Sequence, residues 1–177
     1  VVQQVEAGRI DLATPIGTWA PHIVNERWTP LTAWHVLTHT SGIGDIDLEA
    51  ILRHGEGRDD MLRHIAKVGQ LTPPGSTFHY ASFPFDVLAE ALGHELGRPF
   101  EDVIRDGLLA PLGMTDTTFD PGSDARLAGR TAPIVVGDWG GQVSTDDEGL
   151  VPAFTRLHLM GGGLWSTAAD LLRFGRA

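Results

Sequence analysis

Two adjacent helices bounded by proline and glycine most constrain how this chain folds. Apolar residues recur every three or four positions across 85–96, which predicts a helix with one buried face. Gly97 ends this helix and Pro99 opens the next, because glycine adopts a left-handed stop and proline fits a first helical turn. Pro111 stops the second helix, since proline cannot continue one. The sequence therefore predicts a helix pair that organises the rest of the chain.

A tyrosine lies directly ahead of this pair. Tyr80 is the single tyrosine of the chain, and it follows a turn at Pro73-Pro74-Gly75. Ser82 is a candidate N-cap for the first helix, because its hydroxyl can accept a free amide of the first turn. Behind the pair, Pro111-Leu112-Gly113-Met114 predicts a closing turn. The stretch 73–119 thus forms one unit that runs from turn to turn.

Shorter elements flank this unit on both sides. Each has apolar residues at helical or strand spacing between glycine and proline breaks. The predicted helices cover 1–8, 32–42, 47–54, 59–68 and the residues after Thr167, and a short strand is expected around 134–136. Thr32 and Thr167 are the candidate N-caps, and Asp170 lies at capping-box spacing from Thr167.

Composition excludes several classes of protein. The chain has 177 residues with 42% hydrophobic and 20% charged residues, which is typical of a globular domain. Its net charge of -10 repels phosphate backbones, so nucleic acid is not an expected partner. The absence of cysteine excludes disulfides and a cysteine nucleophile, and it leaves the compartment open between cytoplasm and periplasm or exterior. No run of 18 apolar residues occurs, so no membrane-spanning helix is expected.

Three motifs of the chain are Leu37-Thr38-His39-Thr40-Ser41-Gly42, the segment around Tyr80, and the glycine-rich run from Gly161 to Asp170. Together they resemble motifs of the serine β-lactamase-like hydrolases, which include class C β-lactamases, D,D-peptidases and related carboxylesterases. The resemblance implies an α+β fold of the β-lactamase/D,D-peptidase type. We expect this chain to cover mainly the helical region, with little of the antiparallel sheet, as a single incomplete domain over 1–177.

The resemblance also implies a mechanism. A serine attacks the substrate to form an acyl-enzyme, and a lysine one helical turn later lowers the pKa of the serine or of a neighbouring tyrosine. Tyr80 occupies the place of the family's catalytic tyrosine. Ser82 and the loop of Gly161, Gly162 and Gly163 are the expected substrate-binding residues.

The nucleophile itself is missing from this sequence. The chain contains no Ser-x-x-Lys, because its single lysine, Lys67, follows His64 at that spacing. No Lys-Thr-Gly or His-x-Gly follows Asp170. We expect the chain to be the middle of a longer hydrolase with the missing motifs on either side. The alternative is a non-catalytic relative that retains the cleft for binding or scaffolding.

The residues near Tyr80 favour ester substrates. Class C β-lactamases carry asparagine two positions after the tyrosine, whereas this chain has Ser82, whose hydroxyl replaces an amide poorly. The run Asp86-Val87-Leu88 is similar to the Asp-Val-Leu run of the esterase branch. The expected substrates are therefore small esters, with amides and lactams as alternatives, and no cofactor is expected.

Each candidate residue also has a purely structural interpretation. His35 and His39 share a helix face, but no third ligand lies at a metal-site spacing, so no metal is expected. His39 is instead predicted to hydrogen-bond the turn at Ser41-Gly42. Ser82 is first a helix cap and second a site residue, and glycine runs alone are weak indicators of anion binding.

Overall fold

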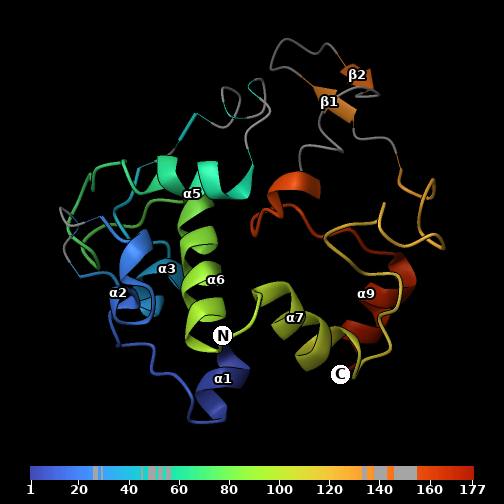
Figure 1. Ribbon diagram of the computed structural model, residues 1–177, viewed down its shortest axis with the longest axis horizontal. Helices are drawn as coiled ribbons and strands as arrows, with labels where there is room; N and C mark the ends of the chain where they lie inside the picture. The colour runs from blue at the N-terminus through green and yellow to red at the C-terminus, as the bar shows by residue number, and fades with distance from the viewer. Residues whose placement is uncertain are drawn as a thin grey trace.

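One long helix, α6 (Phe83–Glu95), runs through the middle of a mostly helical structure (Figure 1). Figure 1 shows a computed structural model that describes residues 1–25, 28, 30–44, 46, 47, 51, 54, 57–132, 135–137, 143–145 and 155–177. The other elements are α1 (Val2–Glu6), α2 (Ile16–Trp19), the 3₁₀ helix η1 (Pro21–Ile23), α3 (Ala33–Leu37), α5 (Arg58–Ile65), α7 (Phe100–Ile104), the π-helical turn η2 (Arg105–Leu109), β1 (Val135–Gly137), β2 (Val143–Thr145) and α9 (Ala168–Phe174).

The predicted helix pair is confirmed. Ser82 stands at the N-cap of α6 and Pro84 lies in its first turn. Gly97 follows the helix with φ +66°, the left-handed backbone that an L-residue adopts only at a cost. Pro99 is the N-cap of α7, and the π-helical turn carries the chain on to Leu109. Helix α6 is therefore set by local sequence signals at both of its ends.

The main hydrophobic core lies between α6 and the helices from the first half of the chain. Helices α2, α3 and α5 all contact α6, and Figure 1 shows α5 lying across its upper end. The largest fully buried core side chains are Ile16, Leu31, Val36, Ile43, Met61, Ile65, Val87 and Leu157. Leu157 belongs to the segment that leads into the glycine loop, so the core also fixes the approach to that loop.

A second, smaller cluster lies on another face of α6. Ala89 packs there with Phe100 and Phe119, whose rings meet edge to face with centroids 5.4 Å apart. Met160 packs against the same cluster. Helix α6 therefore connects the first half of the chain to the residues around the glycine loop.

Strands make a small contribution. Within the described ranges, β1 and β2 form a two-stranded antiparallel pair, with Val136 opposite Ser144. This confirms the strand expected around 134–136 and the prediction that the chain covers mainly helical structure. The helix expected over 47–54 lies largely outside the described residues, although the Ile51 N–H donates to the Asp47 carbonyl as in a helix.

The helix predicted over 32–42 is shorter than expected. Thr32 caps it as predicted, with its side chain accepting the His35 N–H, but α3 ends at Leu37. His39 and Gly42 adopt φ of +54° and +71°, which no right-handed helix can contain. A Cβ on Gly42 would lie 2.0 Å from the Thr72 carbonyl oxygen, so the turn passes directly against the segment that leads to Tyr80.

Candidate active site

Tyr80 lies on a segment that hydrogen bonds to the 39–42 turn hold in place. The Gly75 N–H donates to the Thr40 carbonyl, and the His79 N–H donates to the His39 carbonyl, both at 2.8 Å. Gly75 itself takes φ +81° in the turn that opens the segment. Tyr80 is 65% exposed, so its phenol is available to a substrate or to another part of the protein.

The imidazole of His39 supports the Tyr80 ring. The two rings stack with centroids 4.6 Å apart and an interplanar angle of 27°. His39 Nδ1 accepts the Ala81 N–H at 3.3 Å, so this nitrogen carries no proton in the bond. The prediction that His39 bonds the turn at Ser41-Gly42 was wrong, because its ring accepts the Ala81 N–H and stacks on Tyr80 instead.

Phe78 and Phe85 complete an aromatic cluster around His39. Phe78 meets the imidazole edge to face at 5.8 Å, and Phe85 lies tilted against it at 5.1 Å. Phe78 and Tyr80 are two residues apart, and both of their rings contact the imidazole of His39. The cluster thus joins the exposed tyrosine to the first turn of α6.

Ser82 lies against the glycine loop. A Cβ on Gly161 would be 2.9 Å from Ser82 Cβ and 3.1 Å from its Oγ, so only glycine allows this approach. Ser82 occupies the predicted N-cap position, but its side chain makes no capping hydrogen bond. Pro84 lies in the first turn of the helix, and it lacks an N–H that would need capping.

The three loop glycines differ in how much space a side chain would have at each position. Gly163 is buried, and a Cβ there would lie 2.7 Å from the Leu159 nitrogen, so the loop closes too tightly for any side chain. The Gly163 N–H donates to the Leu159 carbonyl at 2.7 Å. Gly162 is exposed with open space around it. The structure therefore brings Gly161 to Ser82 and leaves Gly162 facing outward.

A buried carboxylate on α6 escaped the sequence analysis as a site residue. Asp86 is 1% exposed, and its Oδ1 accepts from Arg58 Nη1 at 3.2 Å and from the Met160 N–H at 3.1 Å. Burial raises the pKa of Asp86 to about 6, against the opposing effects of Arg58 and the Met160 amide. An aspartate between Phe85 and Val87, in the apolar first turns of the helix, was the available signal.

A second buried carboxylate anchors the other end of the loop. Asp170 Oδ2 accepts from the Asp116 N–H and from Thr117 Oγ1, each at 2.8 Å. Burial would raise the pKa of Asp170, but these hydrogen bonds and the Arg173 guanidinium outweigh burial and lower it. The predicted capping by Thr167 is confirmed, since its Oγ1 accepts the Asp170 N–H at 3.2 Å.

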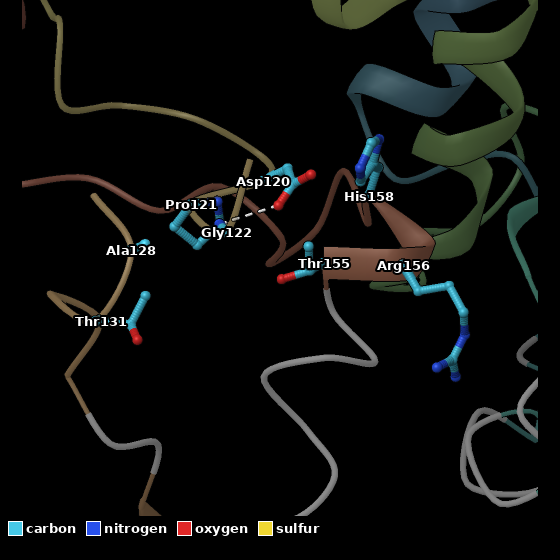
Figure 2. A pocket seen from close by; sticks show the side chains of 9 residues that line it. Asp120, Pro121, Gly122, Ala128, Thr131, Thr155, Arg156 and His158 are labelled. Carbon is cyan, nitrogen blue, oxygen red and sulfur yellow. Dashed lines mark hydrogen bonds between the residues drawn. The ribbon is translucent and has the colours of Figure 1, made fainter. Parts of the chain in front are cut away.

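A cavity of about 530 Å³, which Tyr80 does not line, lies beside Asp120 and His158 (Figure 2). Its lining residues are Asp120, Pro121, Gly122, Ala128, Gly129, Thr131, Thr155, Arg156 and His158. Figure 2 shows the Asp120 carboxylate turned back to the Gly122 N–H, which it accepts at 3.0 Å. None of the residues predicted for the site lines this cavity.

The part of the chain that the structure describes contains neither a cluster of metal ligands nor a membrane-spanning helix. No group of three or more His, Asp or Glu side chains there could hold a metal ion. His35 Nδ1 pairs with Thr32 at the start of α3, and His39 faces Tyr80, so the two histidines do not converge. Every helix within the same residues is too short or too polar to cross a membrane.

Comparisons with known proteins cover the whole chain. Residues 1–177 match the family described as Beta-lactamase. The D-alanyl-D-alanine-carboxypeptidase/endopeptidase AmpH of Escherichia coli K12 is 26% identical over 98% of this chain and 44% of its own length. Esterase EstB of Burkholderia gladioli is 28% identical over 98% of this chain and 52% of its own length.

A solved structure shows the same fold. The penicillin binding protein from Bacillus halodurans matches with a TM-score of 0.78 and 24% identity, over 99% of this chain and 53% of that one. The chain thus spans about half the length of the relatives it matches. The predicted family resemblance and the partial coverage of the β-lactamase/D,D-peptidase fold are both confirmed.

Proposed function

This chain belongs to the Beta-lactamase family, and from that premise we propose that it is the tyrosine-bearing part of a serine hydrolase that cleaves small esters through an acyl-enzyme. The observation that carries the proposal is the stacking of Tyr80 on His39 beside the contact of Ser82 with Gly161. It places an exposed phenol, a hydroxyl and a glycine loop on neighbouring segments. The name of EstB, an esterase, supports the choice of ester over lactam.

Tyr80 acts as the general base in this proposal. Its phenolate takes the proton from the attacking serine and then returns it to the leaving alcohol. Stacking on His39 fixes the ring, which reduces the conformational freedom lost when the reacting atoms meet. Ser82 and the glycine loop shape the substrate side of the site, where Gly161 admits no side chain.

An apolar groove along α6 supports an upstream position for the nucleophile. The groove holds about 220 Å³ and extends from Val1 past Leu92 and Leu88 to Phe85, whose ring contacts His39. A helix that continued α1 ahead of Val1 would fill this groove and approach Tyr80. Because Val1 lines the same groove as Phe85, we place the nucleophile on a helix ahead of Val1.

The test uses the full-length protein that contains this chain. Hydrolysis of p-nitrophenyl butyrate and of a chromogenic cephalosporin is followed for the wild type and for Tyr80→Phe, which keeps the ring but removes the hydroxyl. We expect ester turnover by the wild type and a loss of about 10²–10⁴-fold in kcat for Tyr80→Phe. The double variant Phe78→Tyr/Tyr80→Phe moves the hydroxyl two residues along the segment and should stay inactive.

Two outcomes would overturn the proposal. Full activity of Tyr80→Phe would remove the tyrosine from the mechanism. A wild type that neither turns over esters nor is labelled by a fluorophosphonate would instead identify a non-catalytic relative. Faster cleavage of the cephalosporin than of the ester would reverse the substrate preference while leaving the role of Tyr80 intact.

A further inference from the structure

The segment that enters the glycine loop is held by a charged side chain from α5. Arg58 Nη1 donates to the Leu157 carbonyl at 3.1 Å and to the His158 carbonyl at 3.0 Å. These two carbonyls lie about a hundred residues further along the chain than Arg58. Arg58 therefore joins the first half of the chain to the loop. It binds backbone carbonyls, so these bonds do not depend on the side chains of the loop residues.

Asp86 holds the next residue of the same segment. Its Oδ1 accepts the Met160 N–H at 3.1 Å and also pairs with Arg58 at 3.2 Å. The pair thus binds two carbonyls and one amide within four consecutive residues. Gly161, which contacts Ser82, comes directly after Met160.

The segment needs this support because part of its backbone is strained. His158 has φ +47°, a left-handed conformation that costs a non-glycine residue about 1–2 kcal/mol. Its ring bonds Glu101 of α7, with Nδ1 and Oε1 2.8 Å apart. Such a conformation persists where surrounding contacts fix it, and here the contacts come from α5, α6 and α7.

We propose that Arg58 and Asp86 are positioning residues, which fix the segment 157–160 so that Gly161 lies against Ser82 beside Tyr80. The role in catalysis rests on the proposed function, whereas the fixation of the loop does not. Neither side chain reaches the substrate in this proposal. They act only by setting where the loop backbone lies.

Arg58→Lys is the sharpest test, in the full-length protein. Lysine keeps the charge, but while its single ammonium replaces Nη1 it cannot also replace Nη2, which donates to the Asp86 carbonyl at 3.5 Å, and Nε, which pairs with Glu90 at 3.7 Å. We expect hydrogen exchange across 158–163 to accelerate at least about tenfold, since local opening exposes these amides. We also expect kcat/KM for p-nitrophenyl butyrate to fall about a hundredfold, as small misplacements at reacting groups do.

Arg63→Lys is the matched control. Arg63 lies on the same helix and pairs with Asp60 at the surface, so neither exchange nor turnover should change. Asp86→Asn is a second variant, because its side-chain oxygen can still accept the Met160 N–H while the ion pair is lost. We expect its exchange rate and turnover to lie between those of the wild type and Arg58→Lys.

Each result decides the proposal. Unchanged exchange across 158–163 in Arg58→Lys would overturn it, and so would equal acceleration across α6, which would indicate a purely structural role. Faster loop exchange with unchanged kcat/KM would overturn the positioning role. If the wild type lacks esterase activity, the proposed function fails, and the exchange data alone then decide whether Arg58 and Asp86 fix the loop.

Discussion

The imidazole of His39 stacks on the ring of Tyr80 with centroids 4.6 Å apart, although 41 positions separate the two residues in the sequence. His39 also accepts the Ala81 N–H, so one side chain supports both the ring and the backbone of the tyrosine segment. This explains physically why the Leu-Thr-His-Thr-Ser-Gly motif and the tyrosine motif occur in one chain. The first motif is the support on which the second rests.

Replacing His39 tests this support in the full-length protein. Asparagine tolerates the left-handed backbone of this position, so His39→Asn removes the stacked ring without adding much strain. We expect kcat/KM for esters to fall about ten- to a hundredfold, because Tyr80 is no longer held. His79→Asn, at an exposed position of the same segment, is the control and should leave kcat/KM unchanged. Equal losses in both variants would show that the stacking is incidental.

Because Gly42 lies so close to Thr72, replacing this glycine should cause a large loss of stability. Gly42→Ala places a Cβ 2.0 Å from the Thr72 carbonyl oxygen, so the backbone of the turn or of the tyrosine segment must shift. We expect the free energy of unfolding to fall by more than about 4 kcal/mol, as for other severe backbone clashes. Urea denaturation measures it directly.

Gly8→Ala separates this clash from backbone strain. Gly8 has φ +66°, close to that of Gly42, but no atom lies within 4 Å of the added Cβ. This variant should lose only about 1–2 kcal/mol, the usual cost of a left-handed alanine. Similar losses for Gly8→Ala and Gly42→Ala would mean that the turn does not pack against Thr72 as described.

Local signals in the sequence predicted the helix pair, the positions of its ends and the place of Tyr80, because proline, glycine and apolar spacing act within a few residues. The contacts that build the site are not local. Ser82 meets Gly161, and Arg58 meets Asp86 28 positions away, so neither contact leaves a spacing signal in a single sequence. A buried ion pair could be suspected only from the charge of Asp86 among apolar neighbours.

Asp86 makes a pH-dependent contribution to stability whose sign differs from that of most carboxylates. Its pKa rises from 3.8 to about 6 on burial, so the folded state binds the proton more tightly than the unfolded state. The contribution is therefore fully present below pH 3.8 and is lost as the pH rises through about 6. Over this range it changes by about 2–3 kcal/mol, at 1.4 kcal/mol per pKa unit.

Asp86→Asn isolates this contribution, because asparagine does not titrate. Urea denaturation of both proteins from pH 4 to pH 7.5 gives the difference in unfolding free energy between wild type and variant. This difference should shift against the wild type as the pH rises, and it should level off above about pH 7. A difference that does not change with pH would show that the Asp86 pKa is not raised in the folded protein.

The contribution of Asp170 to stability should have the opposite pH dependence. Replacing Asp170 tests whether its carboxylate joins the turn after η2 to α9. Its lowered pKa means that its stabilising contribution is present above pH 3.8 and is lost as the pH falls through the folded-state pKa.

Asp170→Ala leaves the Asp116 N–H and the Thr117 hydroxyl without their acceptor, so we expect the free energy of unfolding to fall by about 3 kcal/mol at pH 7. Asp106→Ala is the matched control, because Asp106 pairs with Arg98 and Arg105 at the surface, where water replaces such pairs with little loss. Thermal unfolding of the two variants at pH 7 compares them, and a Tm for Asp170→Ala as high as that for Asp106→Ala would mean that the carboxylate does not join the two segments.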